Sequence, residues 1–229
     1  MYDSEIMRVM GQASFGELLE FREDFCERAG ECGHRSFTIM SGALDRTDVC
    51  PEKLSYEGPF GVGYGVCVYE VRGADAARNF KEQFEEKERA RIMAQRAQED
   101  AYVQLARKAV EAYVRKREVL DVPQDLPGEM YAERAGAFVS IKENGSLRGC
   151  IGTIQATQPS IAEEIIGNAI SASSRDYRFP PIEAKELDKL TISVDILGER
   201  QKVDSPDKLD VKRYGVIVTK GSKRGLLLP

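Results

Sequence analysis

The stretch Leu147-Arg148-Gly149-Cys150-Ile151-Gly152-Thr153 sets an arginine and a thiol between two glycines in a run of strand-forming residues. It follows the apolar residues 137–142 and the turn Glu143-Asn144-Gly145-Ser146, whose Asn-Gly pair accepts the positive φ of a tight hairpin. We therefore expect residues 147–153 to form the returning strand of a β-hairpin. Alternation along a strand would place Arg148, Cys150 and Gly152 on one face and the other four residues on the opposite face.

Arg148 and Cys150 make this strand a candidate site. A nearby cation favours the thiolate, the form of cysteine that attacks electrophiles or binds metals. Gly149 and Gly152 expose backbone that a ligand can approach closely. The alternative is that Cys150 packs as a small hydrophobe and that the glycines mark a β-bulge. Cys150 is thus a candidate catalytic residue, and Arg148, Gly149 and Gly152 are candidate ligand contacts.

A second cluster of charged residues follows a predicted helix. Ser160 and Glu163 have the spacing of a capping box, so the helix should begin there and cover the sheet that carries Cys150. Beyond it, Arg175 and Arg178 flank Asp176, and two guanidinium groups match a carboxylate or phosphate well. These three residues predict a site for a small anionic ligand, unless Asp176 simply pairs with one arginine and closes the loop.

The second half of the chain has the pattern of an antiparallel sheet. Residues 190–197 alternate between apolar and polar, and residues 215–219 and 225–228 flank a basic turn. Between the two halves, residues 73–98 are highly charged with both signs mixed, which predicts a solvated helical linker. We therefore divide the chain into a first domain at 1–72, the linker at 73–98 and a second domain at 99–229.

Composition excludes several classes of protein. The formal net charge of -5 gives no reason to expect nucleic acid or an anionic membrane as partner. Five cysteines without a CxxC pair argue against a disulfide framework and favour reduced thiols, and no segment approaches the roughly 20 apolar residues of a membrane span. We expect a cytoplasmic protein. Both ends look cut, at a helix and at the apolar residues 226–229, so we also expect a piece of a longer protein.

The motif 147–152, the run Asp176-Tyr177-Arg178-Phe179-Pro180-Pro181, the strand from Leu190 and the hairpin at 215–229 together resemble the AMMECR domain, from about Glu99 to the end of the chain. The resemblance implies a component of the AmmeMemoRadiSam system, in the domain order of its protein A. Memo-like and radical-SAM proteins of the same system would then be its partners. The resemblance implies an α+β fold, with a mainly antiparallel sheet and packed helices, but no mechanism.

Residues 29–36, 42–44 and 56–64 resemble the C-terminal part of a subunit-B-type class III extradiol dioxygenase domain and its relative Memo. The resemblance implies the end piece of an α/β domain whose members hold non-haem iron through two histidines and a carboxylate. His34 is the one histidine here, so this piece cannot build that site alone. At most Glu31, or Cys32 in the Memo-like reading, would supply one metal ligand in a full-length protein. We expect no cofactor in this chain; the alternative for Glu31, Cys32 and His34 is a turn with packing roles.

Two classes of function remain open. The first is a non-catalytic module with an anion-binding groove around the motif at 147–152. The second is an enzyme that uses Cys150 as nucleophile or ligand, or a dioxygenase-type iron activity in the full-length fusion. Residues 99–229 contain no histidine, so a Cys-His dyad within this part is excluded. A module needs only shape and charge, whereas an enzyme needs an activated group, so the sequence favours the module.

Overall fold

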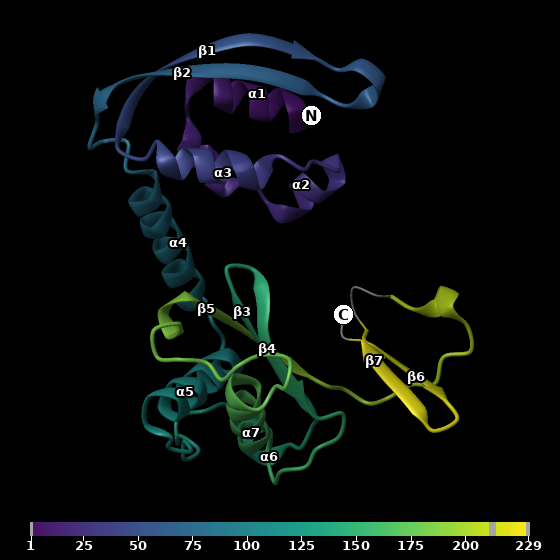
Figure 1. Ribbon diagram of the computed structural model, residues 1–229. Helices are drawn as coiled ribbons and strands as arrows, with labels where there is room; N and C mark the ends of the chain where they lie inside the picture. The colour runs from purple at the N-terminus through teal and green to yellow at the C-terminus, as the bar shows by residue number, and fades with distance from the viewer. Residues whose placement is uncertain (1, 211–213, 228–229) are drawn as a thin grey trace. The chain divides into compact units, whose positions relative to one another are not determined.

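The computed structural model describes residues 2–210 and 214–227 (Figure 1). Leu228 and Pro229, the end of the predicted last hairpin, lie outside the described residues. The chain divides into two compact units. The first comprises Met1–Asp100 with Glu143–Ser146 and Lys185–Thr191, and the second comprises the remaining segments. Helices combine with antiparallel strand pairs, so the predicted α+β class is confirmed. No helix among the described residues is long and apolar enough to cross a membrane.

The first unit packs helices against one long hairpin. Its elements are α1 (Tyr2–Gln12), the 3-10 turn η1 (Phe15–Glu20), α2 (Glu23–Ala29), α3 (His34–Ala43), β1 (Thr47–Glu57), the turn η2 (Pro59–Gly61), β2 (Tyr64–Ala74) and α4 (Phe80–Arg96). The core is apolar and partly aromatic, with Phe15 edge-on to Tyr69 at 5.0 Å between ring centroids. The segment predicted as a linker largely forms α4, in which Ile92 is buried. The proposed domain boundaries remain a prediction.

The chain from Ala101 onward carries the motif hairpin. Its elements are α5 (Ala101–Lys116), α6 (Gly128–Ala132), β3 (Ala137–Glu143), β4 (Ser146–Gly152), α7 (Ile161–Ser174), η3 (Leu187–Lys189), β5 (Leu190–Ile196), η4 (Pro206–Lys208), β6 (Val216–Lys220) and β7 (Lys223–Leu227). The three-stranded sheet has the order β4-β3-β5, and β6 pairs with β7 in a separate sheet. Helices α5 and α6 both pack on α7.

Local sequence explains the two elements that position the motif. Asn144 and Gly145 have φ values of 52° and 82°, which is the left-handed conformation that their turn between β3 and β4 requires. At the start of α7, the hydroxyl of Ser160 accepts a hydrogen bond from the backbone of Glu163 and donates one to its carboxylate at 2.9 Å. The predicted hairpin and the predicted helix start, with Ser160 as its N-cap, are therefore confirmed.

Gly149 allows α7 to lie close to β4. A Cβ atom added at Gly149 would overlap the carbonyl oxygen of Ala172 in the last part of α7. The overlapping atom belongs to the backbone, so it cannot be relieved by turning a side chain. The absence of a side chain at Gly149 is therefore a packing requirement.

We predict that Gly149→Ala lowers the free energy of unfolding by about 1–3 kcal/mol, because α7 and β4 must move apart. Gly167→Ala is the matched control, since a Cβ atom at this position in the same helix meets nothing within 4 Å. That control should be neutral or stabilise by up to about 1 kcal/mol, the usual gain of Gly→Ala in a helix. Urea unfolding measures both changes. Equal effects of the two substitutions would contradict the close packing at Gly149.

Candidate functional site

The carboxylate of Asp176 joins the motif strand to the loop that follows α7. It is buried and accepts a hydrogen bond from the backbone N–H of Cys150 at 2.9 Å. It also accepts from the backbone N–H of Arg178 at 3.1 Å and from Nε and Nη2 of the Arg178 guanidinium at 2.9 and 2.7 Å. The bonds from the Arg178 side chain, helped by the two backbone N–H groups and opposed by burial, hold the pKa of Asp176 far below its usual range.

Two arginines strengthen the same connection. Nη2 of Arg178 donates to the carbonyl of Cys150 at 3.0 Å, so this guanidinium bridges Asp176 and β4. Arg148 reaches in the opposite direction and donates to the carbonyls of Pro180 at 2.8 Å and Pro181 at 3.4 Å. The two predicted clusters therefore form one network, in which each segment supplies an arginine that binds the backbone of the other.

The thiol of Cys150 lies on the face of β4 that points away from α7. It accepts a hydrogen bond from the hydroxyl of Ser140 on β3 at 3.2 Å. A Cβ atom at Gly152 would overlap the ring of Phe138, another β3 residue, whereas Gly149 lies under α7. These contacts match the alternation expected along residues 147–153. The thiol is half-buried and free.

The predicted contact residues divide into two groups. Arg148, Cys150, Asp176 and Arg178 come together in the network. Arg175 is exposed at the end of α7, and its side chain has no ion pair with any residue in the described part of the chain. The space beside Gly149 and Gly152 is taken by the protein's own atoms. The roles of these residues in ligand binding remain predictions.

Sequence reasoning missed Glu164, a buried carboxylate on α7. It accepts hydrogen bonds from the hydroxyls of Thr153 and Thr157 at 2.6 and 2.8 Å, and from the backbone N–H groups of Thr157 and Gln158 at 2.6 and 2.8 Å. Burial alone would raise the pKa of Glu164, but these hydrogen bonds outweigh it and lower the pKa. The group fixes the loop that leaves β4. The sequence did contain a signal for a buried carboxylate, because Glu164 lies four residues after the helix cap and on the apolar face of the helix.

The candidate metal ligands of the first unit do not form a metal site. The carboxylate of Glu31 accepts the backbone N–H of His34 at 2.5 Å, which satisfies a free donor at the start of α3. Cys32 is exposed, and the ring of His34 stacks on Phe21 at 5.5 Å between centroids. Among the described residues, no group of three or more His, Cys, Asp or Glu side chains could hold a metal ion. These three residues therefore do not build the iron centre by themselves, and Glu31 or Cys32 as one ligand in a full-length protein remains a prediction.

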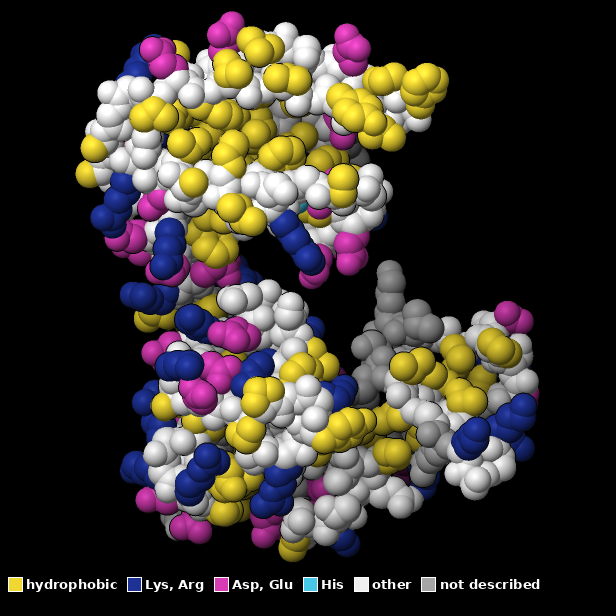
Figure 2. Space-filling view, viewed as in Figure 1, with side chains coloured by type: hydrophobic (Ala, Val, Ile, Leu, Met, Phe, Trp, Pro, Cys, Tyr) yellow, Lys and Arg dark blue, Asp and Glu magenta, His cyan; other side chains and the backbone are white. Residues whose placement is uncertain are grey.

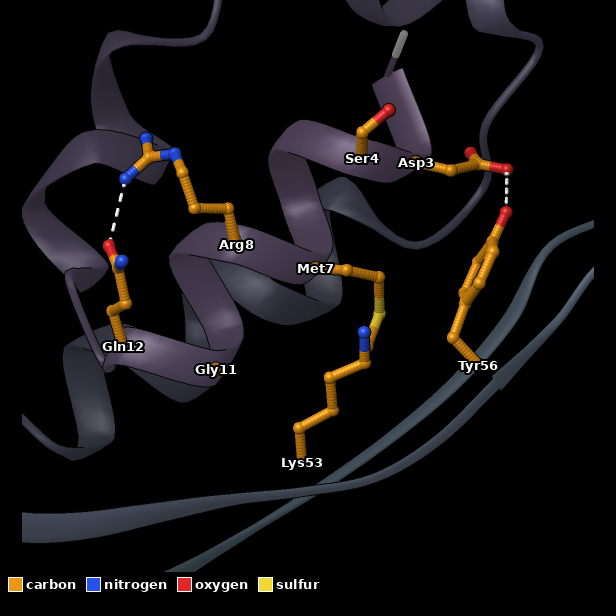
Figure 3. Close-up of a pocket in the computed structure, with 8 residues that line it drawn as sticks. All are labelled: Asp3, Ser4, Met7, Arg8, Gly11, Gln12, Lys53 and Tyr56. Atoms are coloured by element: carbon orange, nitrogen blue, oxygen red, sulfur yellow. Dashed lines mark hydrogen bonds between the residues drawn. The ribbon is translucent and has the colours of Figure 1, made fainter.

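A hollow of about 680 Å³ lies between α1 and β1, and none of the residues singled out above lines it (Figure 3). Tyr56 donates to the carboxylate of Asp3 at 2.7 Å across its rim. Arg8 is already paired with Glu5 and Glu17. The polar side chains of this hollow are thus largely occupied with one another.

The part of the chain that carries the network combines helices with an antiparallel sheet, as α+β domains do. The AMMECR1 family model matches residues 103–229, so the chain belongs to the AMMECR1 family. A protein of Thermotoga maritima is 49% identical over 132 residues, which are 57% of this chain and 76% of that protein. The crystal structure of an uncharacterised protein from Pyrococcus horikoshii has a TM-score of 0.52 and 36% identity, and the match covers 56% of this chain and 66% of that one.

A protein of Clostridium acetobutylicum is similar along the whole chain. It is 40% identical over 232 residues, which cover 100% of this chain but 48% of the relative. The chain thus spans about half the length of this curated relative.

We predict that Asp176→Asn lowers the free energy of unfolding at pH 7 by about 1–3 kcal/mol, because Arg178 and the Cys150 N–H lose a charged acceptor. The folded pKa of Asp176 lies below its unfolded value of about 3.9, so its contribution is complete above that value and declines as the pH falls toward the folded pKa. The difference between wild type and variant should therefore be constant from about pH 7 to 5 and narrow below about pH 4.

Urea unfolding across this pH range is the measurement, with Asp125→Asn, a change at an exposed aspartate, as the matched control. The control should leave stability unchanged within about 0.5 kcal/mol. If the difference in free energy of unfolding between the wild type and Asp176→Asn became larger as the pH falls, this would contradict a lowered pKa of Asp176 in the folded protein.

Proposed function

We propose that the AMMECR1 part of this chain is a non-catalytic binding module whose surface beside the motif at 147–152 takes a small anion. The observation that carries the proposal is the state of Arg178. Its Nε and Nη2 are anchored on Asp176, yet its side chain remains 43% exposed. Its Nη1 atom makes no hydrogen bond within the described ranges of the chain. An anchored guanidinium with an outward donor is a ready partner for a carboxylate or phosphate.

Pre-organisation favours binding at this loop. An arginine that is already fixed loses less side-chain freedom when it binds a ligand than a mobile arginine does. Arg175 and Tyr177, which is 95% exposed, lie on the same short segment and offer further donors. Asp176 is the only carboxylate among residues 175–178, and Arg178 already compensates its charge.

The surroundings of Cys150 favour a module over an enzyme. A nucleophilic cysteine needs a base or a cation that activates it. The thiol accepts a hydrogen bond from Ser140, Arg148 donates to the carbonyls of Pro180 and Pro181, and the charge of Arg178 is already paired with Asp176. Asp176, the carboxylate bonded to this strand, has a pKa too low for a general base at neutral pH. These contacts support Cys150 as part of the binding surface.

Membership of the AmmeMemoRadiSam system extends this proposal to partners. The motif resemblance supports Memo-like and radical-SAM proteins as the proteins that would use the module. The net charge of -5 argues against nucleic acid. In this proposal the bound anion belongs to the chemistry of those partners, and the module presents or senses it.

Titration with inorganic phosphate and with malonate, followed by NMR at low ionic strength, tests the anion site. We predict that Arg175→Ala, which leaves the Asp176 network intact, weakens binding roughly fivefold, as loss of one exposed charge contact should. Lys108→Ala is the control, because it removes one exposed positive charge from α5, outside the motif segments.

The control should change the affinity by less than about twofold, and added salt should weaken binding to the wild type. Shifts should centre on residues 148–152 and 175–178. An absence of saturable binding of either anion, or an equal loss in both variants, would overturn the proposal.

A further inference from the structure

The hairpin of β1 and β2 has one face without a partner. Both strands are 11 residues long, and the described residues place them in a sheet of two strands, so each strand has an unpaired edge. A long edge that exposes apolar side chains is a site where further polypeptide pairs. A two-stranded sheet also gains stability from packing on both faces.

The inner face of this hairpin is filled by α1. Val49 is buried there, and Tyr69 donates to the carbonyl of Met10 at 2.9 Å. A Cβ atom at Gly65 would overlap the sulfur of Met7, so the backbone of β2 lies directly against α1. The side chains that alternate with Gly65 and Tyr69 must therefore point the other way.

That outer face carries an apolar row. In the register of the hairpin, Val68 lies opposite Glu52, Val66 opposite Ser55 and Tyr64 opposite Glu57, while Leu54 sits at the register shift. We call Leu54, Tyr64, Val66 and Val68 the outer face; their exposed fractions lie between 43% and 62%. Figure 2 shows hydrophobic side chains gathered over the hairpin and in the space between it and α3.

The glutamates that border the outer face and the length of one relative indicate what would cover this face. Glu52, Glu57 and Glu70 border the apolar row, so a complementary segment carries apolar residues flanked by lysine or arginine. The relative from Clostridium acetobutylicum matches this whole chain with 48% of its length, so it holds a further half that could supply that segment.

We propose that the outer face of the hairpin binds the polypeptide that corresponds to the unmatched half of the Clostridium acetobutylicum relative, whether this is supplied in the same chain or separately. That polypeptide would pack on the outer face and bury Leu54, Tyr64, Val66 and Val68, and one of its strands would pair with the free edge of β2. This contact does not depend on the anion site, so each proposal can fail without the other.

Co-expression tests this contact. The chain of 229 residues carries an affinity tag, and the unmatched half of the Clostridium acetobutylicum relative is expressed with it untagged. We expect co-purification at one copy of each polypeptide. Replacing Val66 and Val68 by lysine should reduce the recovered partner at least tenfold, because two cations then face its basic flank. Val119→Lys, the same change at an exposed valine outside the hairpin, should leave recovery unchanged.

Light scattering and hydrogen exchange complete the test. The Val66 and Val68 side chains are already exposed, so the double variant should fold, and its circular dichroism should match that of the wild type. In the complex, amides of β2 should become protected. Absence of the complex, or a complex that survives the double variant, would overturn the proposal. So would self-association of the chain that the double variant abolishes, since the outer face would then bind a second copy.

Discussion

The hydrogen bond from the Cys150 N–H to the Asp176 carboxylate is the contact on which the motif region depends. It links the middle of β4 to the loop after α7, and the same carboxylate anchors Arg178. Without the Asp176 carboxylate, Arg178 would lose the anchor that directs it to the carbonyl of Cys150, and Arg148 would still join β4 to the loop through Pro180 and Pro181. One buried negative charge thus fixes the positions of a thiol and a cation.

One face of the hairpin packs against α7. Gly149 lets the helix backbone approach β4, and Glu164 binds the loop that follows the strand. Asn168, one helical turn after Glu164, donates to the carbonyl of Ala137 at 2.9 Å. The strand is thus held on one face by α7 and at its free edge by Asp176, which leaves Cys150 and the neighbouring Arg178 little freedom to move. Such rigidity suits a binding surface, because ordering costs have been met before a ligand arrives.

Local chemistry made several features predictable. The Asn144-Gly145 turn, the helix cap at Ser160 and the alternation along residues 147–153 each depend on neighbours in the sequence, and the structure contains all three. The pairing of Asp176 with an arginine was left as an alternative to an anion fork, because sequence spacing cannot show whether a guanidinium also points to solvent. The structure contains both the pair and an exposed part of Arg178.

Other features depended on segments far apart in the chain. The carbonyl partners of Arg148 lie 32 and 33 residues away, and nothing in their local sequence marks them as acceptors. Glu31 stays a predicted metal ligand of a full-length protein, and in this structure its carboxylate accepts the backbone N–H of His34 at the start of α3. In both cases the residue type indicated polarity correctly, while the fold determined the partner.

Amide hydrogen exchange at Cys150 tests the central contact most directly, with Asp176→Asn as the comparison and the Thr153 amide, which donates to the carbonyl of Ala137, as an internal reference. The account predicts that the Cys150 amide exchanges slowly in the wild type and at least roughly tenfold faster in the variant, because its local opening becomes easier. The Thr153 amide should keep its rate apart from any change in global stability. A Cys150 amide that exchanges at the same rate in both proteins would contradict the claim that Asp176 holds the motif strand to the loop.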